Sequence, residues 1–195
     1  MKRLLVLILS VALLTPLNVL AATYTLDPAH TTIGFKAKHL MIANVKGVFE
    51  EFKGSVVIDE KDITKSKVNV SVEIASINTN IAKRDEHLRS GDFFDAAKYP
   101  TMTFVSTKVE RAGTGTLKVT GNLTLKGVTK QVVLTVDGPS GEIKSPQGVA
   151  KRGASAVATI NRQDFGVSWN KKLDAGGVLV GDEVQIVIDA ELDKQ

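Results

Sequence analysis

The chain has 195 residues, no Cys, and 25 Lys and Arg against 21 Asp and Glu, which gives a formal net charge of +4. The lack of Cys excludes disulfides, thiol catalysis and thiolate metal sites. The basic residues are scattered singly and only 5% of all residues are aromatic, so the composition argues against a nucleic-acid partner. The length fits one domain that can bury a sizeable core.

The first 21 residues have the pattern of a secretory signal peptide. Two basic residues precede an apolar run from Leu4 to Leu14, and small residues follow at Ala21 and Ala22. The run is about half of the roughly 20 apolar residues that a transmembrane helix needs, so it predicts a cleaved segment and no membrane span. We expect cleavage after Ala21, with Ala22 as the alternative, and export of the mature domain, residues 22–195, to the periplasm.

Residues 22–195 are typical of an all-β domain, because short runs with an apolar residue at every second position recur along them. Strands are expected at 32–39, 48–58, 68–74, 102–110, 116–126, 132–136, 152–160 and 184–192. Eight or nine antiparallel strands, each with one face to bury, fit either a closed barrel or a two-sheet sandwich. The periodicity alone does not separate these two architectures.

Residues 77–100 depart from the strand pattern. Within them, residues 82–91 predict a short helix that ends on Gly91, and a polar stretch then leads to Tyr99 and Pro100. Excursions longer than about 12 to 15 residues in a compact domain are usually functional. We therefore expect one long loop with a short helix that serves as a lid or a site loop.

No catalytic constellation stands out in the sequence. Ser90 lacks the Gly-x-Ser-x-Gly context of a hydrolase nucleophile. The three histidines are His30, His39 and His87, and the first two would point to opposite faces of one regular strand. We expect no catalytic site, no metal site and no cofactor, and we expect His39 to face the interior of the domain.

Two clusters of polar side chains lie beside aromatic residues, and each combines cationic and anionic groups. They are Arg84, Asp85 and His87, and Asn161, Arg162 and Asp164 close to Phe165 and Trp169. In one interpretation the opposite charges satisfy each other and pin the loop to the rim of the sheet. In the other, the cationic groups bind an anionic head group at the mouth of a pocket.

Several stretches carry a resemblance to a known family, in that family's order and over nearly all of the mature chain. They are residues 24–35, 38–40, 84–90, 92–95, 99–100, 121–128, 160–166 and 180–184. On these residues the chain resembles the YceI-like family of lipocalin-like, polyisoprenoid-binding proteins of the bacterial periplasm. The resemblance implies an extended lipocalin-like antiparallel β-barrel of about eight strands, and so favours a barrel over a sandwich.

The resemblance also implies a long apolar cavity for a polyisoprenoid or another apolar chain, such as a quinone tail or a fatty acid. Together with strand parity it predicts a lining of Ile33, Phe35, His39, Val70, Val72, Phe104, Phe165 and Trp169. The expected function is that of a periplasmic lipid-binding or carrier protein. An enzyme that acts on a lipid head group and a ligand-free structural or stress barrel are the alternatives, and a homodimer is left open.

Overall fold

The computed structural model describes residues 21–174 and 176–195. The expected signal peptide therefore lies outside the described residues, except for Ala21. In chain order the strands are β1 (Ala22–Leu26), β2 (Thr32–His39), β3 (Ala43–Phe49), β4 (Phe52–Ile58), β5 (Lys67–Glu73), β6 (Ile77–Asn78), β7 (Thr101–Arg111), β8 (Thr116–Leu125), β9 (Val128–Asp137), β10 (Ile143–Lys144), β11 (Ala150–Asn161) and β12 (Val180–Lys194). The helical elements are η1 (Ile63–Lys65), η2 (Ile74–Ser76), α1 (Ala82–Arg89) and η3 (Arg162–Phe165).

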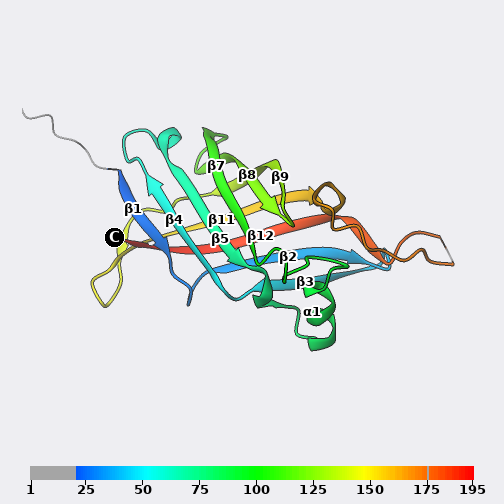
Figure 1. The fold of residues 1–195 in the computed structure, drawn as a ribbon. Helices are drawn as coiled ribbons and strands as arrows, with labels where there is room; N and C mark the ends of the chain where they lie inside the picture. The colour runs from blue at the N-terminus through cyan, green and yellow to red at the C-terminus, as the bar shows by residue number, and fades with distance from the viewer. Residues whose placement is uncertain (1–20, 175) are drawn as a thin grey trace, which may run out of the picture.

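Pairing between β11 and β12 closes the sheet on itself (Figure 1). The hydrogen-bonded ring runs β11, β9, β8, β7, β5, β4, β1, β12 and back to β11, and its pairings are antiparallel. A closed ring leaves no unpaired strand edge, which is how a barrel avoids edge-to-edge association. The barrel implied by the family resemblance is confirmed over the sandwich.

At one end of the barrel, β2, β3 and β6 extend the wall beyond β1, β4 and β5. Both β1 and β2 pair with β12, so they form one long strand that is interrupted between Leu26 and Thr32. The single strand expected at 48–58 is likewise two strands, β3 and β4, and the break between them lies opposite η2, which separates β5 from β6 on the neighbouring segment.

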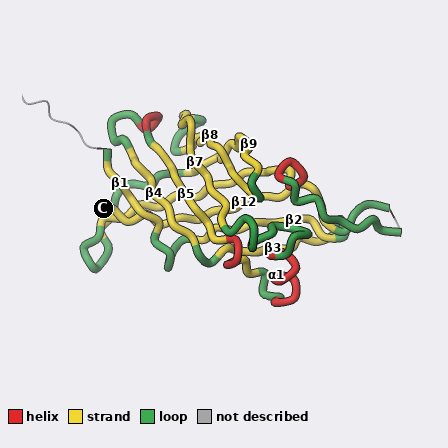
Figure 2. Tube along the Cα trace, in the orientation of Figure 1, coloured by secondary structure: helices red, strands yellow, loops and turns green. Residues whose placement is uncertain are grey.

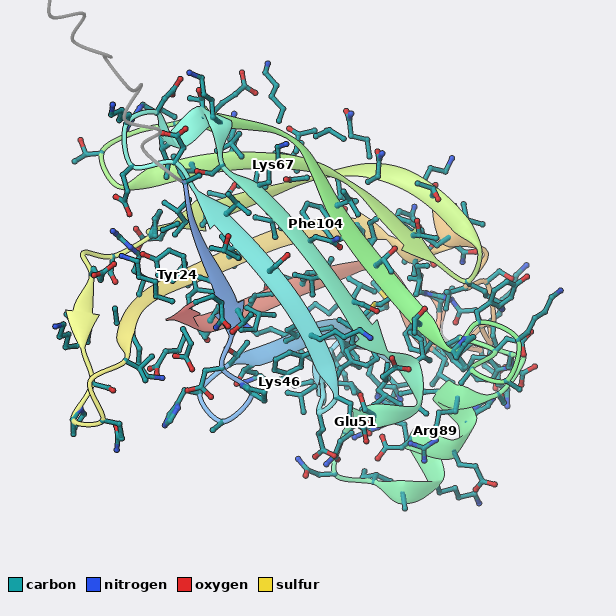
Figure 3. All side chains as sticks on the ribbon, turned by 60° about the vertical axis from the view of Figure 1, so that its left-hand side comes forward. Tyr24, Lys46, Glu51, Lys67, Arg89 and Phe104 are labelled. Atoms are coloured by element: carbon teal, nitrogen blue, oxygen red, sulfur yellow. The ribbon has the colours of Figure 1, made fainter. Side chains whose placement is uncertain are left out.

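Strand β8 shows the expected alternation most clearly, since its inward residues are buried and the residues between them are more exposed. Glycines on the inner wall make room for aromatic rings of neighbouring strands. A Cβ on Gly47 would lie 2.5 Å from Phe35 Cζ, and one on Gly121 would clash with Phe104 Cζ. Each ring thus fills the place of a missing side chain on the wall of the barrel; Phe104 is labelled in Figure 3.

Helix α1 lies outside the strands beside β3 (Figure 2). It ends on Ser90 rather than on Gly91, because the Ser90 N–H and Oγ both donate to the His87 carbonyl and Gly91 does not adopt a left-handed conformation. In residues 21–174 and 176–195, no helix is both long and apolar enough to cross a bilayer.

Candidate ligand-binding cavity

A cavity of about 270 Å³ runs inside the barrel. Every strand of the closed ring contributes to its wall, and most of the lining side chains are Val, Leu, Ile, Phe and Ala. An apolar cavity of about 150 Å³ is already large enough to stay dry and take up benzene. The lumen of this barrel can therefore hold an apolar ligand of more than six carbon atoms.

The cavity is long and narrow. Alternate residues of β12 from Val184 to Leu192 all line it, and at roughly 3.3 Å per residue they span about 26 Å of strand. Ile186 and Ile188 point into the barrel yet are only half-buried, as expected where side chains face unfilled space. A small volume drawn out over this length suits one extended chain better than a compact molecule.

Five of the residues predicted to line the cavity do so: Ile33, Phe35, Val70, Val72 and Phe104. The other three are His39, Phe165 and Trp169, and the structure places them outside the lining.

His39 has the inward parity, but the lining on β2 ends at Ala37, and His39 pairs with Val180 and Ala43 next to the turn. Phe165 is fully enclosed in the core at η3, with an exposed fraction of 2%. Strand parity gives the direction of a side chain, but it does not say where along the strand the lumen ends.

Leu88, Phe93 and Phe94, from the segment 77–100, line the cavity although strand parity could not select them. The Phe93 ring lies 5.1 Å from the ring of Trp169, and His87 stands edge-on to both at 5.0 and 4.9 Å. The segment therefore contributes apolar side chains to one end of the lumen. Their signal in the sequence is the pair of aromatic residues within an otherwise polar stretch.

The first polar cluster is satisfied within its own segment. Arg84 donates to the Oγ1 and to the carbonyl of Thr79, both at 2.7 Å, and the buried Asp85 accepts the Thr79 N–H at 2.9 Å. His87 lies 2.9 Å from an oxygen of the exposed Asp92. These bonds tie α1 to the end of β6, and none of these side chains lines the cavity.

In the second polar cluster only Arg162 reaches the cavity wall. Asn161 accepts the Gln163 N–H at 2.9 Å and caps η3, and Asp164 is exposed. Of this cluster, only Arg162 could therefore contact a ligand in the cavity, so its hydrogen bonds distinguish a structural role from binding of a head group.

All five N–H donors of the buried Arg162 have acceptors. They are the carbonyls of Val167, Trp169, Val180 and Gly181 and the carboxylate of Asp182. Burial lowers the pKa of this guanidinium, and Asp182 acts in the opposite direction. With no donor left over, Arg162 fastens the segment after η3 to the start of β12 and has nothing to offer an anionic ligand.

A third polar cluster, which no motif in the sequence indicates, lies at the opposite end of β12. Asp27, His30 and Glu191 are close enough to share a metal ion, but the Lys151 ammonium lies 2.9 Å from Asp27 Oδ2 and 2.7 Å from Glu191 Oε1. A resident ammonium repels a second cation, so absence of a metal remains our expectation. The cluster joins residues from β11, β12 and the loop after β1, which meet only once the barrel is formed.

The Asp27 carboxylate should contribute to stability in a defined pH window. Hydrogen bonds from His30 and Lys151 hold its pKa below the ordinary 3.8, and the same bond to Asp27 raises the pKa of His30 above 6.5. The contribution of Asp27 is present above pH 3.8 and lost as the pH falls further, and that of His30 is present below pH 6.5 and lost as the pH rises.

Replacing Asp27 by Asn should therefore lower the melting temperature most between these two values, and the gap to the wild type should close in more acidic buffer. Thermal scans across the pH range, with the exposed Asp164→Asn as the control, measure this gap. A gap that is the same at every pH would contradict the assignment.

The profile of the YceI-like domain matches residues 24–192. The chain belongs to the YceI-like family. A UPF0312 protein of Shewanella sp. strain ANA-3 is 39% identical to this YceI-like chain over 190 residues, which cover 96% of this chain and 97% of the relative. The family resemblance drawn from the sequence is confirmed.

Solved structures share the same barrel. A YceI protein of Campylobacter jejuni is 38% identical and superimposes with a TM-score of 0.68, over 88% of this chain and 98% of that one. A polyisoprenoid binding domain from Saccharophagus degradans superimposes with a TM-score of 0.62, over 90% of this chain and 99% of that one. Its identity of 16% makes the second likeness one of fold alone.

Proposed function

We propose that this YceI-like protein binds a single long apolar chain of the polyisoprenoid type in its barrel and carries it through the periplasm. The observation that carries the proposal is the long, narrow, apolar cavity walled by every strand of the ring. The Saccharophagus degradans domain has the same fold and is a polyisoprenoid binding domain, which supports the same ligand class here. The signal-peptide pattern of residues 1–21 supports export.

The energetics favour a ligand of several prenyl units. Burial is worth about 0.8 kcal/mol per carbon group, so a five-carbon prenyl unit gains roughly 4 kcal/mol. Association itself opposes binding by about 4 to 15 kcal/mol, and a micromolar complex needs about 8 kcal/mol net. About three to six units therefore suffice for micromolar binding without any polar contact, according to where the cost of association falls in that range.

The polar residues argue against a head-group enzyme as the main function. Arg84 and Asp85 are bonded to Thr79, and the five donors of Arg162 are used by the protein itself. None of these groups is free to act as acid, base or anion clamp toward a chain in the lumen. Affinity should therefore follow the length of the apolar chain and vary little with its head group.

The test is to purify the exported protein, extract it with organic solvent and identify the extracted lipid by mass spectrometry. We expect a near-stoichiometric apolar-chain lipid and an intact protein mass that corresponds to a chain starting at Ala22 or Thr23. The emptied protein should then bind geranylgeraniol more tightly than farnesol, and geranylgeranyl phosphate about as tightly as the alcohol. A protein that carries no lipid and takes up none of these probes would refute a carrier, and conversion of a probe to product would indicate an enzyme.

A further inference from the structure

The turn between β2 and β3 presents three consecutive large apolar residues to solvent. Leu40, Met41 and Ile42, which we call the apolar tip, are 38%, 51% and 82% exposed. The other strongly exposed large hydrophobic residues of the described chain occur singly. The tip lies at the end of the barrel where Ala37 and Val184 pair with each other and line the cavity.

The backbone of the apolar tip is unfavourable for the residues that form it. Leu40 and Met41 have φ of 52° and 61°, and the Ile42 N–H donates to the His39 carbonyl at 3.2 Å. Two successive residues with positive φ, closed by this hydrogen bond, match the φ signs of a type I′ turn, in which Asn-Gly is strongly preferred. Positive φ is unfavourable for large apolar residues, and their exposure at this turn provides little burial to offset it. Backbone strain of this kind clusters at functional sites.

A second hairpin supports the apolar tip. Residues 171–174 and 176–179 form it through the bridge between Lys172 and Val178, and the Leu40 N–H donates to the Leu179 carbonyl at 2.9 Å. A Cβ on Gly177 would lie 3.4 Å from Met41 Cγ. Figure 1 shows both hairpins at the end opposite the C-terminus, where the second hairpin extends beyond the turn between β2 and β3.

Five lysines lie on the strands and the hairpin that lead to the apolar tip. They are Lys36, Lys38 and Lys46 on β2 and β3, and Lys171 and Lys172 on the second hairpin. None of them takes part in an ion pair with another described residue. Lys36 lies directly opposite Lys46 (labelled in Figure 3), an arrangement that destabilises a strand pair.

Acidic residues at this end are fewer. They are Asp164, Asp174, Asp182 and Glu183, and Asp182 is already bonded to Arg162 and Gln163. The surface around the apolar tip is therefore positively charged as a whole, and it suits an anionic partner.

We propose that the apolar tip inserts into the interface of an anionic lipid bilayer while the five lysines contact head-group phosphates. Apolar side chains on a projecting surface, flanked by Lys, are typical of interfacial membrane anchors. A protein partner fits less well, because Lys is depleted in protein interfaces and because such interfaces need about 800 Å² from each partner. The inference deepens the proposed function, since docking would set the tip end of the lumen against the membrane from which a chain is taken.

The test is co-sedimentation of the processed protein with phosphatidylcholine vesicles that contain or lack phosphatidylglycerol. We expect binding only to the anionic vesicles, and its loss at high salt. The decisive variant is Leu40→Asn with Met41→Gly, because these residues suit the turn. Its melting temperature should equal or exceed that of the wild type, while vesicle binding falls at least tenfold. Lys38→Gln with Lys46→Gln should weaken binding to anionic vesicles by about tenfold or more.

The control is Ile143→Ser, which removes a single exposed apolar side chain from β10 and should leave vesicle binding unchanged. Failure of the wild type to bind anionic vesicles at low salt, or equal binding by the Asn-Gly variant, would overturn the proposal. The proposal would also be overturned if the wild type formed a dimer in solution and bound no vesicles, and if the Leu40→Asn, Met41→Gly variant were a monomer. Geranylgeraniol binding in detergent-free buffer tests the lumen separately, because the Asn-Gly variant should retain it.

Discussion

Replacing Arg162 by Met should lower the free energy of unfolding by about 3 to 5 kcal/mol. The residue is 4% exposed, and the substitution removes all five hydrogen bonds. The Val180 carbonyl keeps a donor in Asn170 and the Asp182 carboxylate keeps one in Gln163, so the other three carbonyls lose most. Met keeps most of the apolar stem, so the loss reports the hydrogen bonds rather than a cavity. Urea denaturation followed by intrinsic fluorescence measures it.

Two further variants sharpen the Arg162 prediction. Arg162→Lys keeps the charge but has only three donors on one nitrogen, so it should recover only part of the stability. Arg111→Met removes an exposed arginine at the end of β7 and should change the stability by less than about 0.5 kcal/mol. If Arg162→Met behaves like Arg111→Met, the five bonds do not hold the end of the barrel.

Replacing Val70 by Trp should block ligand binding and leave the fold intact. Val70 lines the lumen and is only half-buried, so an indole can enter unfilled space. Displacing about one prenyl unit would remove roughly 4 kcal/mol, or nearly three orders of magnitude in the Kd for geranylgeraniol. A fluorescence titration of the emptied variant measures the change.

Val72 provides a matched comparison on the same face of β5. It also lines the lumen, but it is 4% exposed, so a Trp there overpacks its neighbours and should destabilise the protein by about 1 to 3 kcal/mol. A comparison of the two variants thus shows which position borders unfilled space in the lumen and which is packed against neighbouring side chains. Equal destabilisation by both, in a protein that binds no chain lipid, would support a solid structural barrel instead.

Local periodicity predicted most of the barrel wall, because side chains alternate along a strand whatever its distant partners are. The strand at 32–39 and the dry face of β8 follow from it directly. It did not predict the break between β3 and β4, which lies opposite η2 in a segment about 25 residues further along the chain. Closure by β11 and β12 followed only from the family resemblance, since a sandwich shows the same alternation.

The polar sites were harder to read from the sequence than the wall. The positive charge of Arg162 suggested a carboxylate partner, but four of its five acceptors are backbone carbonyls. Every residue has a backbone carbonyl, so no sequence pattern indicates which ones accept. Lys151 reaches Asp27 across 124 positions of chain, a pairing that depends on the whole barrel. The inward residues were found by parity, whereas the end of the lumen near His39 depends on where the tertiary packing stops.

The pairing of β1 with β12 has a consequence for the order in which the molecule is made. Residues 24–26, near the start of the barrel, are hydrogen-bonded to residues 192–194, near the end of the chain. A nascent chain that lacks β12 can form only an open sheet, with β1 and β11 as unpaired edges and no enclosed lumen. The barrel therefore cannot close before β12 has been made, so a chain that enters a membrane channel before then, in the export that we propose, does so with its barrel still open.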